Sequence, residues 1–112
     1  MSVKLEINEK IATVVIDRPE ALNALNSDVM KELYEAVEKI KATPDVRVAL
    51  FMGGGEKSFV AGADIKQMAD MTPIEGAEWG RFGQSTFSAI AELPCPTIAM
   101  VQGFALGGGC EL

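Results

Sequence analysis

The sequence predicts an α/β fold with parallel strands and flanking helices, and three observations support this prediction. The chain opens with two short segments that read as a β-hairpin. An amphipathic helix with a single apolar face follows them. Two later segments are almost entirely apolar, which is typical of strands in a parallel sheet, and helical segments separate them.

The first two segments differ in pattern but both predict strands. Residues 3–8 alternate polar and apolar side chains, and residues 11–16 form a β-branched run, with a polar turn at 9–10. Pro19 lies in a break after the second segment, because proline cannot continue a strand ladder.

Asn26 or Ser27 can cap the helix that comes next. Its apolar residues recur at spacings of three and four: Val29, Met30, Leu33, Tyr34, Val37 and Ile40. Residues 43–45, Thr-Pro-Asp, end this helix.

The remainder of the chain continues the alternation of strands and helices. Residues 46–52 predict a strand that is buried on both faces, and residues 97–101 predict a second buried strand. Between them we expect a short helix at 65–71 and a longer one at 72–93, before a terminal loop that begins at Gly103. No repeat, linker or low-complexity segment divides the chain, so we predict one domain over residues 1–112.

Composition excludes several classes of protein. The 112 residues are 48% hydrophobic, which is enough for one core, and carry a net charge of −6, which disfavours nucleic-acid and membrane-surface partners. No apolar run approaches the roughly 18 residues that span a bilayer, and the charged N-terminus reads as a strand and not a signal peptide. Cys95 and Cys110 lie in apolar sequence, which indicates reduced, buried thiols in a cytoplasmic protein.

The chain contains no histidine. A Ser-His-Asp or Cys-His nucleophile therefore cannot be assembled from these residues. The two distant cysteines also lack the spacing of a zinc site, so we expect no metal. Any catalysis has to use carboxylates, backbone amides or groups outside these 112 residues.

Two glycine-rich segments depart from the nucleotide-binding patterns. In residues 52–58, Glu56 stands before the lysine of a phosphate-loop pattern, and its carboxylate would repel phosphate. Residues 103–109 lack the Gly-x-Gly-x-x-Gly spacing of a dinucleotide fingerprint. Nucleotide binding is disfavoured in both cases.

Residues 61–64 and 107–109 form two small-residue turns that follow strands. Because ligands bind beyond the carboxyl ends of parallel strands, the two turns are expected to converge and to present two amides to one oxygen, as an oxyanion hole does. Tight packing, with Asp64 only capping a helix, is the structural alternative. Glu111 lies one helical turn after Gly108, where it supplies a carboxylate or simply favours the helix dipole.

Four segments resemble the enoyl-CoA hydratase/isomerase (crotonase) superfamily: residues 17–25, 59–66, 96–98 and 103–112. The resemblance covers all 112 residues in order. It implies the crotonase-like spiral of ββα units, with this chain as its N-terminal part, ending at the start of the helix that carries Glu111. It also implies an assembly of three or six identical subunits, a homotrimer or hexamer.

The resemblance implies roles for individual residues. Ala63 and Gly108 would donate the two oxyanion-hole amides to the thioester oxygen of an acyl-CoA, and Glu111 matches the first catalytic glutamate of the hydratases. Residues beside coenzyme A would be Ala24, Ala61, Ala63, Asp64, Ile65 and Lys66. No separate cofactor is expected, because the substrate itself carries coenzyme A.

The reaction implied is a lyase reaction, the addition of water to a short-chain trans-2-enoyl-CoA. The hydratases use a second glutamate whose position falls beyond Leu112, so we expect the chain alone to be inactive. Another acyl-CoA reaction (isomerisation, decarboxylation or thioester hydrolysis) is the nearest alternative. A non-catalytic acyl-CoA-binding or RNA-binding member is disfavoured, because the three site residues are all present and RNA would need a basic face.

Two further expectations concern apolar residues. Four residues of the central helices are candidates either for an acyl pocket or for the core: Met68, Met71, Trp79 and Phe82. The apolar residues 104–106 and 112 are expected to be uncovered, which predicts self-association or a complementary chain.

Overall fold

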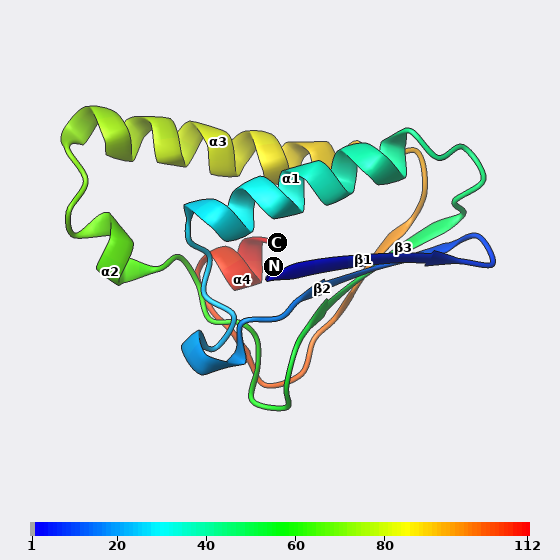
Figure 1. Ribbon diagram of the computed structural model, residues 1–112, viewed down its shortest axis with the longest axis horizontal. Coiled ribbons are helices and arrows are strands. Elements are labelled where there is room, and N and C mark those ends of the chain that lie inside the picture. The colour runs from blue at the N-terminus through cyan, green and yellow to red at the C-terminus, as the bar shows by residue number, and fades with distance from the viewer. Residues whose placement is uncertain (1) are drawn as a thin grey trace.

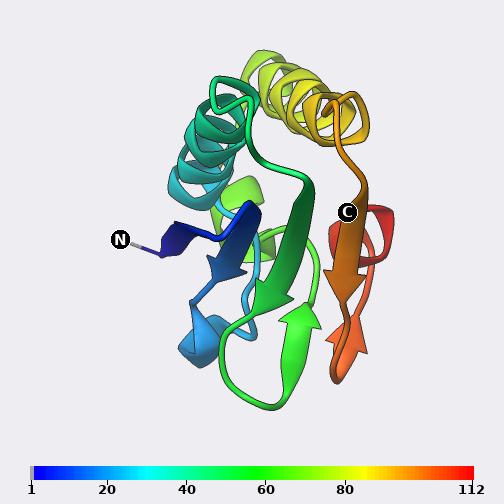
Figure 2. The ribbon, with the colours of Figure 1, turned by 90° about the vertical axis from the view of Figure 1, so that its right-hand side faces the viewer.

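The computed structural model describes residues 2–112 and has the mixed α/β architecture that the sequence predicts. A four-stranded sheet has the order β1 (Val3–Asn8), β2 (Ile11–Ile16), β3 (Val48–Gly53) and β5 (Thr97–Met100). The first pair is antiparallel and the other two are parallel (Figure 2). A second, two-stranded parallel sheet pairs β4 (Ser58–Val60) with β6 (Phe104–Ala105).

The helices lie mainly on one side of the four-stranded sheet (Figure 1). In chain order they are η1 (Pro19–Ala21, a 3-10 turn), α1 (Ser27–Lys41), α2 (Ile65–Met68), α3 (Pro73–Ala91) and α4 (Gly108–Glu111). Helix α1 packs on β1 and β2, and α3 packs along α1. No helix within residues 2–112 is long and apolar enough to cross a membrane.

The two long helices begin where their capping residues predict. The Asn26 side chain accepts a hydrogen bond from the Val29 amide at 2.8 Å, so Asn26 is the cap of α1. At the start of α3, Thr72 and Glu75 form a reciprocal capping box, with hydrogen bonds of 3.0 and 3.2 Å. Both caps satisfy amides that the first helical turn leaves without partners.

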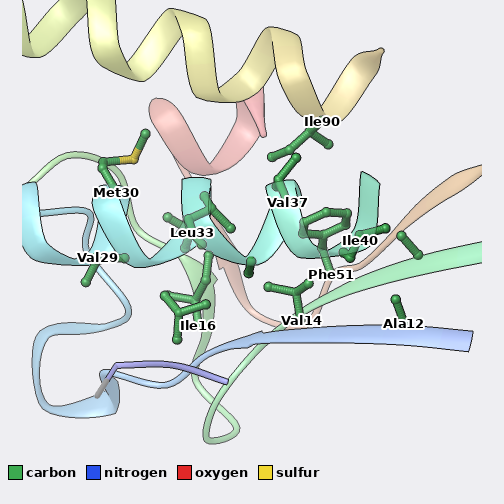
Figure 3. Close-up of a cluster of buried hydrophobic side chains, with 14 of the residues drawn as sticks. Ala12, Val14, Ile16, Val29, Met30, Leu33, Val37, Ile40, Phe51 and Ile90 are labelled. Atoms are coloured by element: carbon green, nitrogen blue, oxygen red, sulfur yellow. The ribbon is translucent and has the colours of Figure 1, made fainter. Parts of the chain in front are cut away.

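The core lies between the sheet and α1. The side chains of Ala12, Val14 and Ile16 alternate onto one face of β2 and point toward the buried stripe of α1 (Figure 3). Phe51 from β3 and Ile90 from α3 close the cluster. Each of the larger side chains, such as Val14 or Ile16, contributes roughly 1.5–3 kcal/mol when it is fully buried.

The prediction that the parallel strands are buried on both faces is wrong. Strand β3 alternates between buried and half-buried residues, and all four residues of β5 are exposed. The helices cover one face of the sheet, and β5 is an edge strand with one partner among the described residues. Ile98 and Met100 of β5 consequently remain about half exposed, at 49% and 45%.

Several boundaries also differ from the expectation. Helix α2 ends at Met68 and not at 71, because the residues that follow form tighter turn bonds before the extended Thr72. The sequence predicts a loop at Phe104–Ala105, but these residues form β6 and pair with β4. The Cys110 thiol is free as expected but exposed, and Cys95 is free and half-buried.

The uncovered apolar residues near the C-terminus are partly as predicted. Phe104 and Leu106 are exposed, at 51% and 55%. Ala105 and Leu112 are instead partly buried and pack against the core cluster.

A buried asparagine joins three parts of the fold. Asn23 is fully buried, with a φ of 60° that asparagine tolerates better than most residues. Its amide nitrogen donates to three backbone carbonyls, those of Gly54, Ser58 and Phe59, at 3.0, 2.9 and 3.1 Å. Its side-chain oxygen accepts from the Arg18 amide at 2.8 Å. The 18–25 segment is thereby held against the end of β3 and the start of β4.

We predict that Asn23→Ala lowers the free energy of unfolding by about 3 kcal/mol, because buried carbonyls and an amide lose their partner. Urea denaturation measures this loss. Asn8→Ala, at the exposed end of β1, is the matched control and should change stability by less than about 0.5 kcal/mol. Equal effects of the two substitutions would contradict the role given to Asn23.

Candidate active site

The segment before α1 runs beside the loop after β4. Leu25 and Ala63 form a parallel bridge, in which the Leu25 amide donates to Gly62 and the Asp64 amide donates to Leu25, both at 2.8 Å. The Ala63 amide lies between these two bonds. It donates to no protein acceptor within the described part of the chain.

The start of α4 comes close to Ala63. Gly109 is buried so near the Val60 carbonyl that a Cβ there would overlap the oxygen, which requires glycine at this position. A Cβ built on Gly108 would lie 3.9 Å from the Ala63 amide nitrogen. The Gly108 amide, like that of Ala63, has no protein acceptor among residues 2–112.

Both residues line one hollow of about 270 Å³, which Glu111 also borders. Glu111 is exposed, and its amide donates to the Gly107 carbonyl at 3.0 Å, which places it one turn into α4. The remaining wall comes from the segment before α1, from α1 and from α3: Leu25, Met30, Trp79, Gly80, Gly83, Gln84 and Phe87. The three residues predicted as catalytic therefore lie around the same space.

A second hollow, of about 370 Å³, is also bordered by Ala63. Five of the six residues predicted beside coenzyme A line it: Ala24, Ala63, Asp64, Ile65 and Lys66. Ala61, the sixth, is half-buried, does not line this hollow, and donates its amide to Leu22 at 3.1 Å. Ala63 borders both hollows.

An ion pair between Arg18 and Asp64 forms part of the wall of the second hollow. Arg18 Nη1 contacts Asp64 Oδ2 at 2.9 Å and also donates to the Ala24 carbonyl at 3.1 Å. The hydrogen bond from Arg18 is the main cause that lowers the pKa of Asp64, with help from the amides of Gln67 and Lys66, while burial opposes the shift. Asp64 caps α2 through those same two amides, so its capping role and its place in the hollow coexist.

The four residues that are candidates either for an acyl pocket or for the core do not share one environment, and two of them, Trp79 and Phe82, pack against the core cluster. Trp79 lines the first hollow, but Met71 and Phe82 line another hollow and Met68 is exposed at 43%. Phe82 turns toward α1, where its ring lies 5.6 Å from that of Tyr34.

Sequence reasoning missed several lining residues. Met30 belongs to the apolar stripe of α1 and Phe87 to the apolar side of α3, so periodicity predicts core for both. Arg18 lies in the 17–25 segment that carries the family resemblance, but no local pattern predicts its ion pair, because this pair joins residues that are far apart in the sequence. Within residues 2–112, no three His, Cys, Asp or Glu side chains are grouped so that they could hold a metal ion.

The fold and this arrangement of two hollows around free backbone amides define a class of α/β protein that has known relatives. The family model described as enoyl-CoA hydratase/isomerase matches residues 6–112. A short-chain-enoyl-CoA hydratase from Clostridium acetobutylicum is 50% identical over 111 residues, which are 99% of this chain and 42% of the relative. A crotonyl-CoA hydratase from Syntrophomonas wolfei is 47% identical over 99% of this chain and 43% of the relative.

A solved structure of an enoyl-CoA hydratase from Bacillus anthracis superposes with a TM-score of 0.94 at 29% identity. It covers 99% of this chain, which spans 43% of that structure. The chain therefore belongs to the enoyl-CoA hydratase/isomerase family and has the crotonase fold. It spans about 42–43% of the length of these relatives.

The lowered pKa of Asp64 predicts a pH dependence of stability. Since the folded pKa lies below the ordinary value of about 3.9, the unfolded chain binds the proton more readily, and stability falls as pH drops through the folded pKa. Asp64→Asn should remove this loss below about pH 4 and lower stability above it. Urea midpoints measured from pH 3 to 7 test this, with Asp45→Asn, an exposed carboxylate, as control. Parallel curves for the wild type and Asp64→Asn would contradict the prediction.

Proposed function

We propose that the protein containing this chain is an enoyl-CoA hydratase, which adds water to short-chain trans-2-enoyl-CoA thioesters. The observation that carries the proposal is the convergence of Ala63, Gly108 and Glu111 on one hollow. Two of these residues have amides without protein acceptors among residues 2–112, and the third carries a carboxylate. This set of groups matches the needs of thioester chemistry without histidine or metal.

In the proposed mechanism, the amides of Ala63 and Gly108 donate to the thioester oxygen. Their hydrogen bonds draw charge onto that oxygen, which makes the β-carbon electrophilic and stabilises the enolate formed when water adds. Glu111 holds the attacking water and accepts its proton as a general base. The second glutamate of this mechanism follows Leu112 in our proposal.

The second hollow is the proposed site of coenzyme A. Asp64, Ile65 and Lys66 border it, and Lys66 is an exposed cation suited to a phosphate group of the ligand. Because Ala63 borders both spaces, the thioester would lie at their junction, with coenzyme A on one side and the acyl group on the other. Ala61 does not line this hollow, and it would support the site indirectly, through the hydrogen bond from its amide to the Leu22 carbonyl.

The names of the two similar bacterial relatives support a short-chain substrate. A second candidate is another acyl-CoA reaction on the same two amides, such as isomerisation, because the matching family model includes isomerases. Glu111 favours hydration in our proposal, because its carboxylate borders the same hollow as the amides.

We further propose that residues 1–112 form the N-terminal part of one crotonase-like domain in a cytoplasmic homotrimer or hexamer. The extent of the match to relatives supports the first point. The two free cysteines are consistent with a reducing compartment.

The proposal predicts that the complete protein hydrates crotonyl-CoA and that Glu111→Gln lowers kcat about 10²–10⁴-fold, because the general base is lost. Gly108→Ala places a methyl group beside the Ala63 amide, and we expect kcat to fall about 10²–10³-fold. Absorbance of the enoyl thioester measures the rate.

Glu92→Gln, at the exposed C-terminal end of α3, is the matched control and should retain the wild-type rate. Wild-type activity in Glu111→Gln would overturn the role of this carboxylate. Double-bond migration without hydration by the wild type would favour the isomerase.

For the 112-residue chain alone, we predict no hydration of crotonyl-CoA above background and association with itself or with a complementary chain. Exposed Ile98, Met100, Val101, Phe104 and Leu106 would drive this association. Light scattering and an activity assay check both points. A monodisperse monomer, or a chain that turns over substrate, would contradict them.

A further inference from the structure

Helix α3 carries three glycines in its interior, Gly76, Gly80 and Gly83. Only proline is less favourable than glycine inside a helix, so such residues often have a packing or functional reason. Their spacing of four and three places all three near one side of the helix. The three glycines differ in whether they line the candidate active site.

Gly80 and Gly83 line the hollow that Ala63, Gly108 and Glu111 border, and Gly76 does not. A Cβ on Gly80 would meet nothing within 4 Å. A Cβ on Gly83 would lie 3.8 Å from Met30 Cε, which is ordinary van der Waals contact. Neither glycine is therefore required for the packing of α3, and both leave space that a side chain would fill.

The other α3 residues on this wall are larger. Trp79, Gln84 and Phe87 border the same hollow, and Met30 borders it from α1. The depth of the hollow along α3 thus depends on the two positions without side chains.

We propose that Gly80 and Gly83 determine acyl-chain specificity, by keeping the hollow open to trans-2-enoyl groups longer than crotonyl in addition to the short-chain substrates of the proposed function. The inference rests on the proposed function. A side chain at position 80 would take up part of the hollow, and a longer acyl group needs more of that space than crotonyl does. One methylene more or less in an apolar pocket changes kcat/KM by about 10–200-fold.

The experiment compares kcat/KM for crotonyl-CoA and trans-2-octenoyl-CoA in the complete protein and in Gly80→Leu. We expect the octenoyl-to-crotonyl ratio of kcat/KM to fall at least about 10-fold. Because leucine favours a helix more than glycine does, the thermal midpoint should stay equal or rise, which separates occlusion from misfolding. Gly83→Ala should shift the ratio in the same direction by less.

Gly76→Leu is the matched control, since it makes the same change one turn earlier on the same helix, where a Cβ also meets nothing within 4 Å. It should leave the substrate ratio at the wild-type value. An unchanged ratio in Gly80→Leu, or an equal change in Gly76→Leu, would overturn the inference.

Binding of saturated thioesters separates this inference from the proposed function. If the wild type hydrates neither substrate, the proposed hydratase function is wrong. Calorimetry with butyryl-CoA and octanoyl-CoA then tests whether Gly80 and Gly83 keep the hollow open to longer acyl groups. Weaker binding of octanoyl-CoA alone in Gly80→Leu would support the inference. Equal effects on both ligands, or no binding by the wild type, would overturn it.

Discussion

The buried side chain of Asn23 is the interaction on which the rest of the structure depends. It bonds to the end of β3, to the start of β4 and to the Arg18 amide, and so ties three backbone segments together. Gly53 permits this contact, because a Cβ there would lie 2.8 Å from the asparagine nitrogen. The stabilisation is local, but the geometry that it fixes extends to the functional site.

The position of the site follows from this anchored segment. Two residues after Asn23, Leu25 bridges to the loop that carries Ala63, and the Arg18 ion pair holds the other side of that loop. Close packing of Gly109 on β4 then brings the start of α4 to the same place. Ordinary packing and hydrogen bonding thus bring together two amides that the chain separates by more than forty residues.

Local patterns predicted much of the fold. Helix α1 was located closely because its apolar spacing and its Asn26 cap agree. The exposure of β5 could not be predicted, since apolar composition does not show which layer covers a strand. A two-residue strand such as β6 has no detectable period. The meeting of the turns at Ala63 and Gly108 was expected from their chemistry, whereas the contribution of Arg18 depends on a distant partner and was missed.

The shared position of Ala63 has a consequence for how such a protein changes over evolution. Of the two hollows that Ala63 borders, residues of α3 line only the first and residues of α2 line only the second. Substitutions on α3 can therefore reshape the first space without disturbing the second. If the first space holds the acyl group and the second its carrier, as we propose, one scaffold can in this way acquire new acyl preferences while it keeps its binding of a common carrier group.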